Sequence, residues 1–375
     1  YEKTRGNPFF TEEVIESLKE EGVIYREEDK WKFKEISKIE FPESVKNVVK
    51  ARFSRLDDEW QKVLIMASII GNDFTFKVLR EIISLNESSL RRILDGLLKT
   101  GLLKHRVVHG EDVCSFADII VRDVVYEEIG TFERQQLHSV VGTILVKEYA
   151  GKIDEHLGEL AFHFLEGGDK DKALDYFLKA GERAQNVYAH NEAVSYLQHA
   201  LELLEQKEGS LEQKARITER LGDIKEWMGE TSACMECWDK SLTLWDQLGE
   251  KKSVSRLHVK MAYTLWDEIG DKDKASEHHH LALEILEKEP ESVELASLYE
   301  DIAHMLWRTG ESAGSLSWNQ KAFEMAERFG DPDVLARCYN NLAALSVKSG
   351  ELEKATRYYE QGLKIDLENN LLGHA

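Results

Sequence analysis

A repeat of about 40 residues constrains the fold of this chain more than any other feature of its sequence. Four pairs of a glycine and an acidic residue recur at spacings of 41, 40 and 40 residues: Gly229-Glu230, Gly270-Asp271, Gly310-Glu311 and Gly350-Glu351. Internal repeats of this kind are typical of arrays in which each repeat packs against its neighbours. Glycine supplies the positive φ that ends a helix. The period therefore predicts a stack of helical hairpins.

Small side chains occupy fixed positions in this repeat. Five residues after the glycines lie Cys234, Ala275, Ser315 and Ala355. Seven residues before the glycines lie Gly222, Tyr263, Ala303 and Ala343. Two helices that pack about 8–10 Å apart need small residues where they cross. We therefore expect the two helices of each hairpin to cross at these positions.

Helical patterning extends over most of the remaining chain. None of the four prolines falls between residues 43 and 289, and apolar residues recur at helical spacing over long stretches. Strand-like alternation is confined to the first third, at Val23–Tyr25, Trp31–Phe33 and Leu102–Phe116. These patterns predict a mainly α fold.

The repeat resembles the tetratricopeptide repeat in its long-helix form. Four copies in phase carry the resemblance, which covers roughly His156–Leu367. It implies an α-solenoid whose concave face is lined by the first helix of each hairpin. We expect this face to bind a protein or peptide partner.

Counting from the expected crossing residues places a set of side chains on the concave face. Tryptophan and arginine, which often anchor protein partners, are among them. The alternative for Trp227 and Trp307 is that they pack against adjacent helices. The expected partner-binding residues are Arg216, Glu219, Asp223, Trp227, Lys260, Thr264, Glu268, Glu300, His304, Trp307, Arg337 and Asn340, with Val347 beside them.

The first 150 residues show a different pattern. A Gly6-Asn7-Pro8 turn precedes an amphipathic segment. Helices are expected at Asp57–Ile70, near Phe74–Ile83 and at Asn86–Thr100. A hairpin that turns at residues 109–112 and a helix from Asp118 follow. Three helices followed by a hairpin is the order of elements in a winged helix.

Two of these segments resemble parts of the STAND class of AAA+-related ATPases. The Gly6-Asn7-Pro8 turn is similar to their lid, and Ser115–Glu128 is similar to the motif that opens their last winged-helix helix. The resemblance implies that Pro8 lies near a bound adenine and that residue 118 faces the β-phosphate. The class usually has histidine there, whereas Asp118 would repel a phosphate.

The resemblance gives the expected domains: a lid or linker remnant at 1–55, a winged-helix-like domain at 56–153 and a tetratricopeptide solenoid at 154–375. The phosphate-binding motif G-x-x-x-x-G-K-[ST] is not found in the sequence. We therefore expect no enzyme activity and no cofactor in this chain. ATP or ADP is expected only with a nucleotide-binding core upstream of Tyr1.

Two motifs could suggest a metal site. Cys234 and Cys237 form a C-x-x-C, but zinc needs four ligands and no second such pair lies near in sequence. His278-His279-His280 point about 100° apart on a helix and cannot converge on one ion. The repeat phase places Cys234 and His279 on buried faces, so we predict packing residues and no metal.

Charge limits the other partners. The chain has 49 Lys and Arg against 70 Asp and Glu, a net charge of −21, which disfavours nucleic acid and anionic membranes. The largely apolar run Val63–Ile70 is too short to cross a bilayer. Five basic and two acidic residues from Asn86 to His109 keep DNA binding as an alternative. Four cysteines without a secretory signal predict a cytoplasmic protein, and its oligomeric state stays open.

The leading prediction is the regulatory and sensor part of a STAND-type signalling ATPase. In it, the solenoid binds a partner protein or effector, and the winged helix transmits occupancy to the nucleotide-binding core. The alternatives are the effector-binding part of a transcription regulator, a segment that regulates a cyclase or kinase in the parent chain, and a stand-alone tetratricopeptide scaffold.

Overall fold

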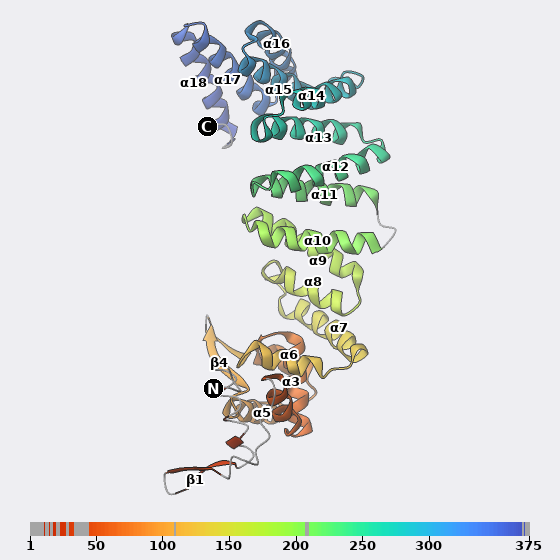
Figure 1. The fold of residues 1–375 in the computed structure, drawn as a ribbon, viewed down its shortest axis with the longest axis vertical. Helices are drawn as coiled ribbons and strands as arrows, with labels where there is room; N and C mark the ends of the chain where they lie inside the picture. The colour runs from red at the N-terminus through yellow and green to blue at the C-terminus, as the bar shows by residue number, and fades with distance from the viewer. Residues whose placement is uncertain are drawn as a thin grey trace. The chain divides into compact units, whose positions relative to one another are not determined.

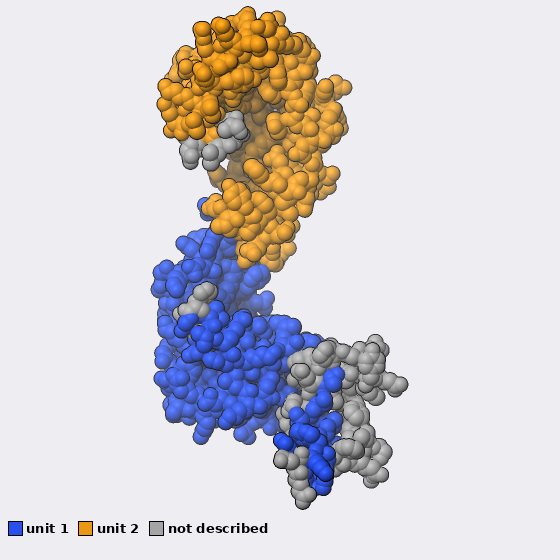
Figure 2. Space-filling view, turned by 90° about the vertical axis from the view of Figure 1, so that its left-hand side faces the viewer, with its two compact units in different colours: residues 1–183 blue, residues 184–375 orange. Residues whose placement is uncertain are grey.

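The computed structural model describes residues 11, 15, 18, 19, 23–27, 30–33, 45–108, 110–206, 210–369 and 371. This part of the chain is mainly helical (Figure 1). The chain divides into two compact units, residues 1–183 (unit 1) and 184–375 (unit 2), which Figure 2 colours separately. No helix in the described ranges is both long and apolar enough to cross a membrane.

Unit 1 contains two small antiparallel sheets and a group of helices. The first sheet pairs β1 (Ile24–Glu27) with β2 (Lys30–Phe33). The second has the order β3-β5-β4, from β3 (Asp73–Thr75), β4 (Leu103–Val108) and β5 (Glu111–Phe116). The helices of residues 45–148 are α2 (Val45–Ser54), α3 (Asp58–Ile70), α4 (Phe76–Ile82), α5 (Glu87–Lys99), α6 (Ile119–Glu127) and α7 (Thr131–Glu148).

The helices and the hairpin of residues 57–128 lie close to their predicted positions, except that Phe74 belongs to β3 and not to α4, and that residues 111 and 112 of the expected turn belong to β5. Asn86 caps α5, because its side-chain oxygen accepts a hydrogen bond from the Ser89 backbone N–H at 2.8 Å. Asp118 caps α6 in the same way, accepting from the Ile120 N–H at 2.9 Å. Asp118 therefore has a structural role at a helix N-terminus. Pro8 and the rest of the Gly6-Asn7-Pro8 turn lie outside the described residues.

Two buried histidines join α7 to α8 (Leu157–Glu166), which follows a 3-10 turn at Ile153–His156. The Nδ1 atoms of His138 and His163 are 3.1 Å apart. Burial, together with the neighbouring His163 ring, lowers the pKa of His138 to about 3, and burial lowers the pKa of His163 to about 4. Both rings are therefore neutral at pH 7, so one Nδ1 donates and the other accepts.

Unit 2 is built from helices that pair as hairpins. Helix α9 (Lys170–Asn186) crosses the boundary between the units, and α10 (His190–Gln206) follows it. In the described residues 211–369, four hairpins follow: α11 (Leu211–Trp227) with α12 (Thr231–Leu248), α13 (Lys251–Thr264) and the π turn η3 (Leu265–Ile269) with α14 (Lys272–Leu286), α15 (Val293–Thr309) with α16 (Ser312–Phe329), and α17 (Pro332–Lys348) with α18 (Leu352–Asn369).

The glycine turns and the small residues have the predicted roles. Gly229, Gly270, Gly310 and Gly350 have φ values of 71°, 79°, 97° and 77°. Cys234, Ala275, Ser315 and Ala355 are at most 3% exposed. The crossing at Gly222 is close, because an added Cβ would lie 2.4 Å from Cδ1 of the fully buried Trp238. These contacts confirm the prediction that the hairpin helices cross at small residues.

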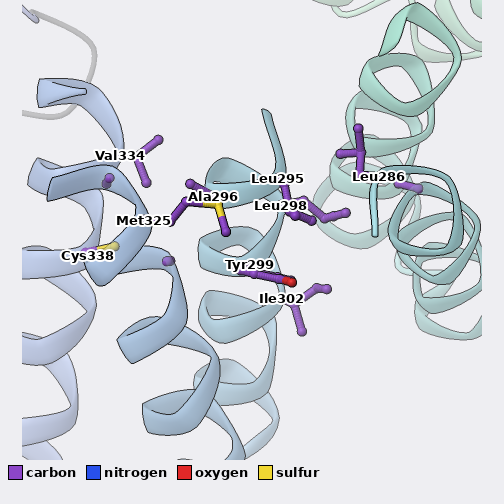
Figure 3. Close-up of a cluster of buried hydrophobic side chains, with 12 residues drawn as sticks. Leu286, Leu295, Ala296, Leu298, Tyr299, Ile302, Met325, Val334 and Cys338 are labelled. Carbon is purple, nitrogen blue, oxygen red and sulfur yellow. The ribbon is translucent and has the colours of Figure 1, made fainter. Parts of the chain in front are cut away.

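The core of unit 2 runs between successive hairpins. Figure 3 shows side chains of α15, among them Leu295 and Leu298, between Leu286 on one side and Met325 and Val334 on the other. A second cluster surrounds Trp238. Burying apolar area in this way stabilises a fold by roughly 25 cal/mol per Å².

The prediction that Tyr263 is a crossing residue is wrong. Ala262 is fully buried, whereas Tyr263 is 59% exposed. The distance from the crossing residue to the turn glycine is therefore eight residues in this repeat (270 − 262) and seven in the next (310 − 303).

The extra residue is accommodated in the π turn η3. The Asp271 N–H bonds to the Leu265 carbonyl, six residues earlier, whereas the Glu311 N–H bonds to the Leu306 carbonyl, five residues earlier. A π turn inserts one residue into a helix without breaking it. The first spacing of 41 instead of 40 residues is the trace of this insertion in the sequence.

Replacing Gly222 with alanine should destabilise the protein, because the added methyl group would overlap the Trp238 ring. We expect a loss of about 1–3 kcal/mol in the free energy of urea unfolding, as for overpacked cores. The matched control is Gly314→Ala in α16, where the added Cβ meets only Leu306 Cδ1, at 3.2 Å. Equal stability of the two variants would contradict a close crossing at Gly222.

Candidate functional site

Unit 2 is hollowed on one side (Figure 2). A groove of about 710 Å³ lies mainly between the first helices of successive hairpins, with α13, η3, α15 and α17 supplying most of its lining. Of the residues predicted to bind a partner, the groove is lined by Lys260, Glu300, His304, Trp307, Arg337 and Asn340. The structure therefore brings half of the predicted set together.

The other six predicted residues lie elsewhere on unit 2. Arg216 bonds to Glu212 on its own helix at 2.7 Å, and Trp227 is 75% exposed. Glu219 and Asp223 bind cations next to the groove. Thr264 is fully buried, and Glu268 accepts a hydrogen bond from Thr231. Val347 is 48% exposed and is not part of the lining.

The π turn explains why the prediction failed for part of this repeat. Counting from the expected crossing residue Tyr263 gave Thr264 and Glu268, but the residues that line the groove at these places are Tyr263 and Asp267, one position earlier in each case. The insertion lies between the crossing residue Ala262 and Gly270, so placing the crossing seven residues before the glycine put it one residue too late in this repeat. The spacing of 41 residues was the available signal.

A network of charges joins α11 to α13 beside the groove. Glu219 accepts hydrogen bonds from Arg256 at 2.9 Å and from Lys260 at 3.1 Å. Lys260 also lies 2.7 Å from Asp223. Burial acts to raise the pKa of Glu219, but the Arg256 hydrogen bond and the Lys260 charge outweigh it, and the pKa lies below its usual value. Glu219 is therefore a bound carboxylate that links two hairpins.

A second network surrounds Arg337 in the groove. One of its nitrogens, Nη1, donates to Glu300 at 2.7 Å and to Asp301 at 2.8 Å, and Nε donates to Asp333 at 3.3 Å. Burial raises the pKa of Glu300, and Asp301 and Asp333 reinforce that rise while Arg337 opposes it. One guanidinium therefore faces three carboxyl groups.

Aromatic side chains lie between charged groups in the same lining. The ammonium of Lys272 is 5.1 Å from the centre of the Trp266 ring, and the guanidinium of Arg308 is 5.9 Å from it. Arg308 also forms an ion pair with Asp267. The His304 and Trp307 rings are 5.5 Å apart. Cations are held over aromatic faces at such distances.

Two buried polar groups of the lining have no hydrogen-bond partner among the described residues. Asn341 is 3% exposed, and neither its Nδ2 nor its Oδ1 has a partner. The Nδ1 atom of His279 also has no partner among the described residues, and this residue is 7% exposed. A buried polar group without a partner costs about 1–3 kcal/mol of stability. A ligand that bonds to the Asn341 amide would remove this cost. The sequence analysis missed Asn341 because it selected its neighbour Asn340.

One residue of each candidate metal motif is buried in the packing of unit 2. Cys234 and His279 are buried, as the repeat phase predicts. Burial and the nearby Glu226 charge raise the pKa of the Cys234 thiol to about 12, so it stays protonated. His278 pairs with His258 at 2.9 Å between Nδ1 atoms. In the part of the chain that the structure describes, no group of three or more His, Cys, Asp or Glu could hold a metal ion.

One part of this chain matches a known family. Residues 294–368 match the family described as tetratricopeptide repeat. The match covers α15–α18 except for the first residue of α15 and the last residue of α18, and these helices form the part of the groove around Arg337. The chain therefore carries tetratricopeptide repeats.

Two curated proteins are similar over part of the chain. An uncharacterized protein, R02095, of Rhizobium meliloti is 25% identical over 206 residues, which cover 55% of this chain and 20% of that protein. Hybrid signal transduction histidine kinase G of Dictyostelium discoideum is 30% identical over 105 residues, or 27% of this chain and 3% of that protein. The matched stretch is thus a fifth or less of each relative's length.

Several solved structures are similar in part. BtubC from P. vanneervenii has a TM-score of 0.47 and 17% identity, covering 59% of this chain and 89% of its own. The apo form of RapI has a TM-score of 0.42 and 15% identity, covering 63% and 98%. A STAND protein with a tetratricopeptide repeat sensor from Pyrococcus horikoshii has a TM-score of 0.39 and 16% identity, covering 98% and 56%.

Removing the Arg337 charge should leave buried carboxylates without compensation. We expect Arg337→Met to lose about 3–5 kcal/mol of unfolding free energy at neutral pH, as for a broken buried ion pair. The raised pKa of Glu300 means that its carboxyl costs stability only above its unfolded-state value of 4.5, so the deficit should shrink as the pH is lowered toward that value.

Two variants control this prediction. Arg216→Met, at an arginine whose side chain is 65% exposed, should change stability by less than about 0.5 kcal/mol. Glu300→Gln combined with Arg337→Met should recover part of the loss, because it removes the most buried uncompensated carboxylate. A double variant no more stable than Arg337→Met would show that the loss does not come from buried charge.

Proposed function

We propose that unit 2 is the protein-binding sensor of a larger signalling protein. The tetratricopeptide repeats suggest a role in protein interaction. In both curated relatives the matched stretch is a fifth or less of the protein, which supports the proposal that this chain is part of a longer protein. The observation that carries the proposal is the groove, in which Tyr263, Trp266 and Trp307 lie in the same lining as the buried amide of Asn341.

The chemistry of this lining suits a peptide segment. A peptide group offers one N–H donor and one carbonyl acceptor, and the Asn341 amide has both complementary groups without a partner among the described residues. The aromatic side chains offer apolar area of the kind that anchors partners.

We further propose that unit 1 couples this binding to a nucleotide-binding core in the parent protein. The order α3, α4, α5 and a β4–β5 hairpin supports a winged helix, and Ser115–Glu128 supports the resemblance to STAND ATPases. In this proposal the chain itself is not an enzyme, ATP or ADP binds to the core, and the protein acts in the cytoplasm. The coupling requires a P-loop upstream of Tyr1 in the reading frame, and a start codon immediately before Tyr1 would contradict it.

Internal ion pairs favour this coupling role over DNA binding. Arg91 bonds to Glu87 at 2.8 Å and lies over the Phe76 ring, and Arg106 bonds to Asp73 at 2.8 Å. These two basic side chains are thus already bound to carboxylates of unit 1. Partner binding would shift the open and closed states of the parent protein only through its different affinities for them.

The test selects dodecapeptides that bind the folded chain from a displayed random library and measures their affinities for two variants. Trp307→Ser should weaken binding by about tenfold or more, as for an interface anchor. Trp227→Ser is the matched control, because Trp227 is an exposed tryptophan at the end of a first helix but does not line the groove. Both variants must retain the helical circular dichroism spectrum.

The outcomes separate the groove from the rest of the surface. Selective weakening by Trp307→Ser supports the groove as the binding surface. Peptides that lose affinity with Trp227→Ser instead, or with neither variant, would contradict it.

A further inference from the structure

The groove of unit 2 holds more carboxyl groups than cations. Its lining includes the five acidic residues Glu226, Asp267, Glu300, Asp301 and Asp333 and the three basic residues Lys260, Arg308 and Arg337. Each of the three cations already forms ion pairs: Lys260 with Asp223, Arg308 with Asp267, and Arg337 with Glu300. The lining is therefore better suited to an incoming cation than to an anion.

The excess of carboxylates is greatest around Arg337. This single guanidinium binds Glu300 and Asp301 through the same nitrogen, so it cannot compensate both when they are ionised, and Asp333 also lies within its reach. The Glu300 side chain is only 4% exposed, whereas those of Asp301 and Asp333 are 21% and 43% exposed. Asp301 and Asp333 can therefore be reached by a ligand in the groove while they remain close to Arg337.

A second excess of carboxylates over cations lies around Glu226. Burial raises the pKa of this carboxyl, and the nearby charges of Asp223 and Glu268 raise it further. Lys260 opposes the rise, but it is already bound to Asp223 and Glu219. The Thr264 hydroxyl donates to Glu226 at 3.2 Å. A ligand cation at this point would relieve the repulsion among the three carboxylates.

Aromatic faces add to the preference for a cation. Tyr263 is 59% exposed and lines the groove together with Trp266 and Trp307. Because Trp266 already has the side chains of Lys272 and Arg308 within 6 Å of its ring centre, the exposed face of Tyr263 is better suited to a ligand cation. An ammonium or guanidinium over an aromatic face gains about 0.5–2 kcal/mol, depending on how far it is desolvated.

Asn341 provides an independent indication of a ligand. It lines the groove, it is 3% exposed, and both polar atoms of its amide have no partner among the residues that the structure describes. A free donor and a free acceptor on one amide suit a peptide group better than a bare ion. The carboxylates therefore indicate the charge of the ligand, and Asn341 indicates that the ligand contains peptide groups.

We propose that the groove binds a basic segment of a partner protein, whose lysine or arginine side chains are received by Asp301 and Asp333 beside Arg337 and by Glu226. This inference rests on the proposed function and adds to it the charge of the partner. The net charge of −21 would accelerate the approach of such a segment at low ionic strength.

The experiment compares three fluorescein-labelled, acetylated nonapeptides with the repeats Arg-Gly-Ser, Gln-Gly-Ser and Glu-Gly-Ser. Fluorescence anisotropy gives their affinities for the whole chain. We expect the arginine peptide to bind about tenfold or more tightly than the other two. Its affinity should fall by about tenfold when the salt concentration is raised from about 50 to about 300 mM, because added salt screens exposed charges.

Charge-neutralising variants locate the binding. Asp301→Asn with Asp333→Asn should weaken the arginine peptide by about tenfold, whereas Glu236→Gln with Glu324→Gln should change its affinity by less than about twofold. The control pair has the same change in net charge, and its residues are exposed on the second helices α12 and α16, outside the groove. Glu226→Gln does not touch the Arg337 network and should weaken binding severalfold. It replaces the first test if Asp301→Asn with Asp333→Asn disturbs folding.

The outcomes separate this inference from the proposed function. Equal weakening by both double variants would mean general attraction to an acidic chain and would overturn the inference. If the glutamine or glutamate peptide binds as tightly as the arginine peptide and Trp307→Ser still abolishes that binding, the inference is overturned while the peptide-binding groove stands.

Discussion

The close approach of paired helices at small residues is the constraint on which the rest of unit 2 depends. At Gly222 the Trp238 ring occupies the space of a side chain, and Ser241 donates to the Ala215 carbonyl at 2.8 Å across the same hairpin. Ala303 and Ala343 play the same part in later hairpins. Because this face of the first helix is fixed against the second, other faces are left for neighbouring hairpins and for the groove.

The groove in turn depends on ion pairs that join successive hairpins. Glu219 of α11 binds Arg256 and Lys260 of α13, and Arg337 of α17 binds Glu300 and Asp301 of α15. Partly buried charges of this kind are costly to desolvate, and apolar residues would often stabilise a fold at least as well. Their presence beside unpartnered amide and imidazole groups is what distinguishes this surface from an ordinary packing face.

The sequence predicted the hairpins well because their determinants are local and repeated. Turn glycines and small crossing residues recur at a fixed period, so one pattern specified helix ends and buried faces together. The prediction failed at Tyr263 because a one-residue insertion moved the phase within a helix that otherwise looks regular.

The chemistry of the groove was harder to predict because it depends on contacts between distant residues. Arg337 and Glu300 are 37 positions apart, and nothing in either local sequence reveals their pairing. The lack of partners at Asn341 follows only from the three-dimensional arrangement. The histidine pairs, such as His138 with His163, are invisible in sequence for the same reason.

The most direct test of the account observes the tryptophan indole N–H resonances of the whole chain, labelled with ¹⁵N-tryptophan, while the arginine nonapeptide is added. The account predicts that the resonances of Trp266 and Trp307 shift, since both side chains line the groove. Trp60 in α3 of unit 1 should stay unchanged. Shifts at Trp60 without shifts at Trp266 and Trp307 would contradict the claim that the groove of unit 2 is the partner-binding surface.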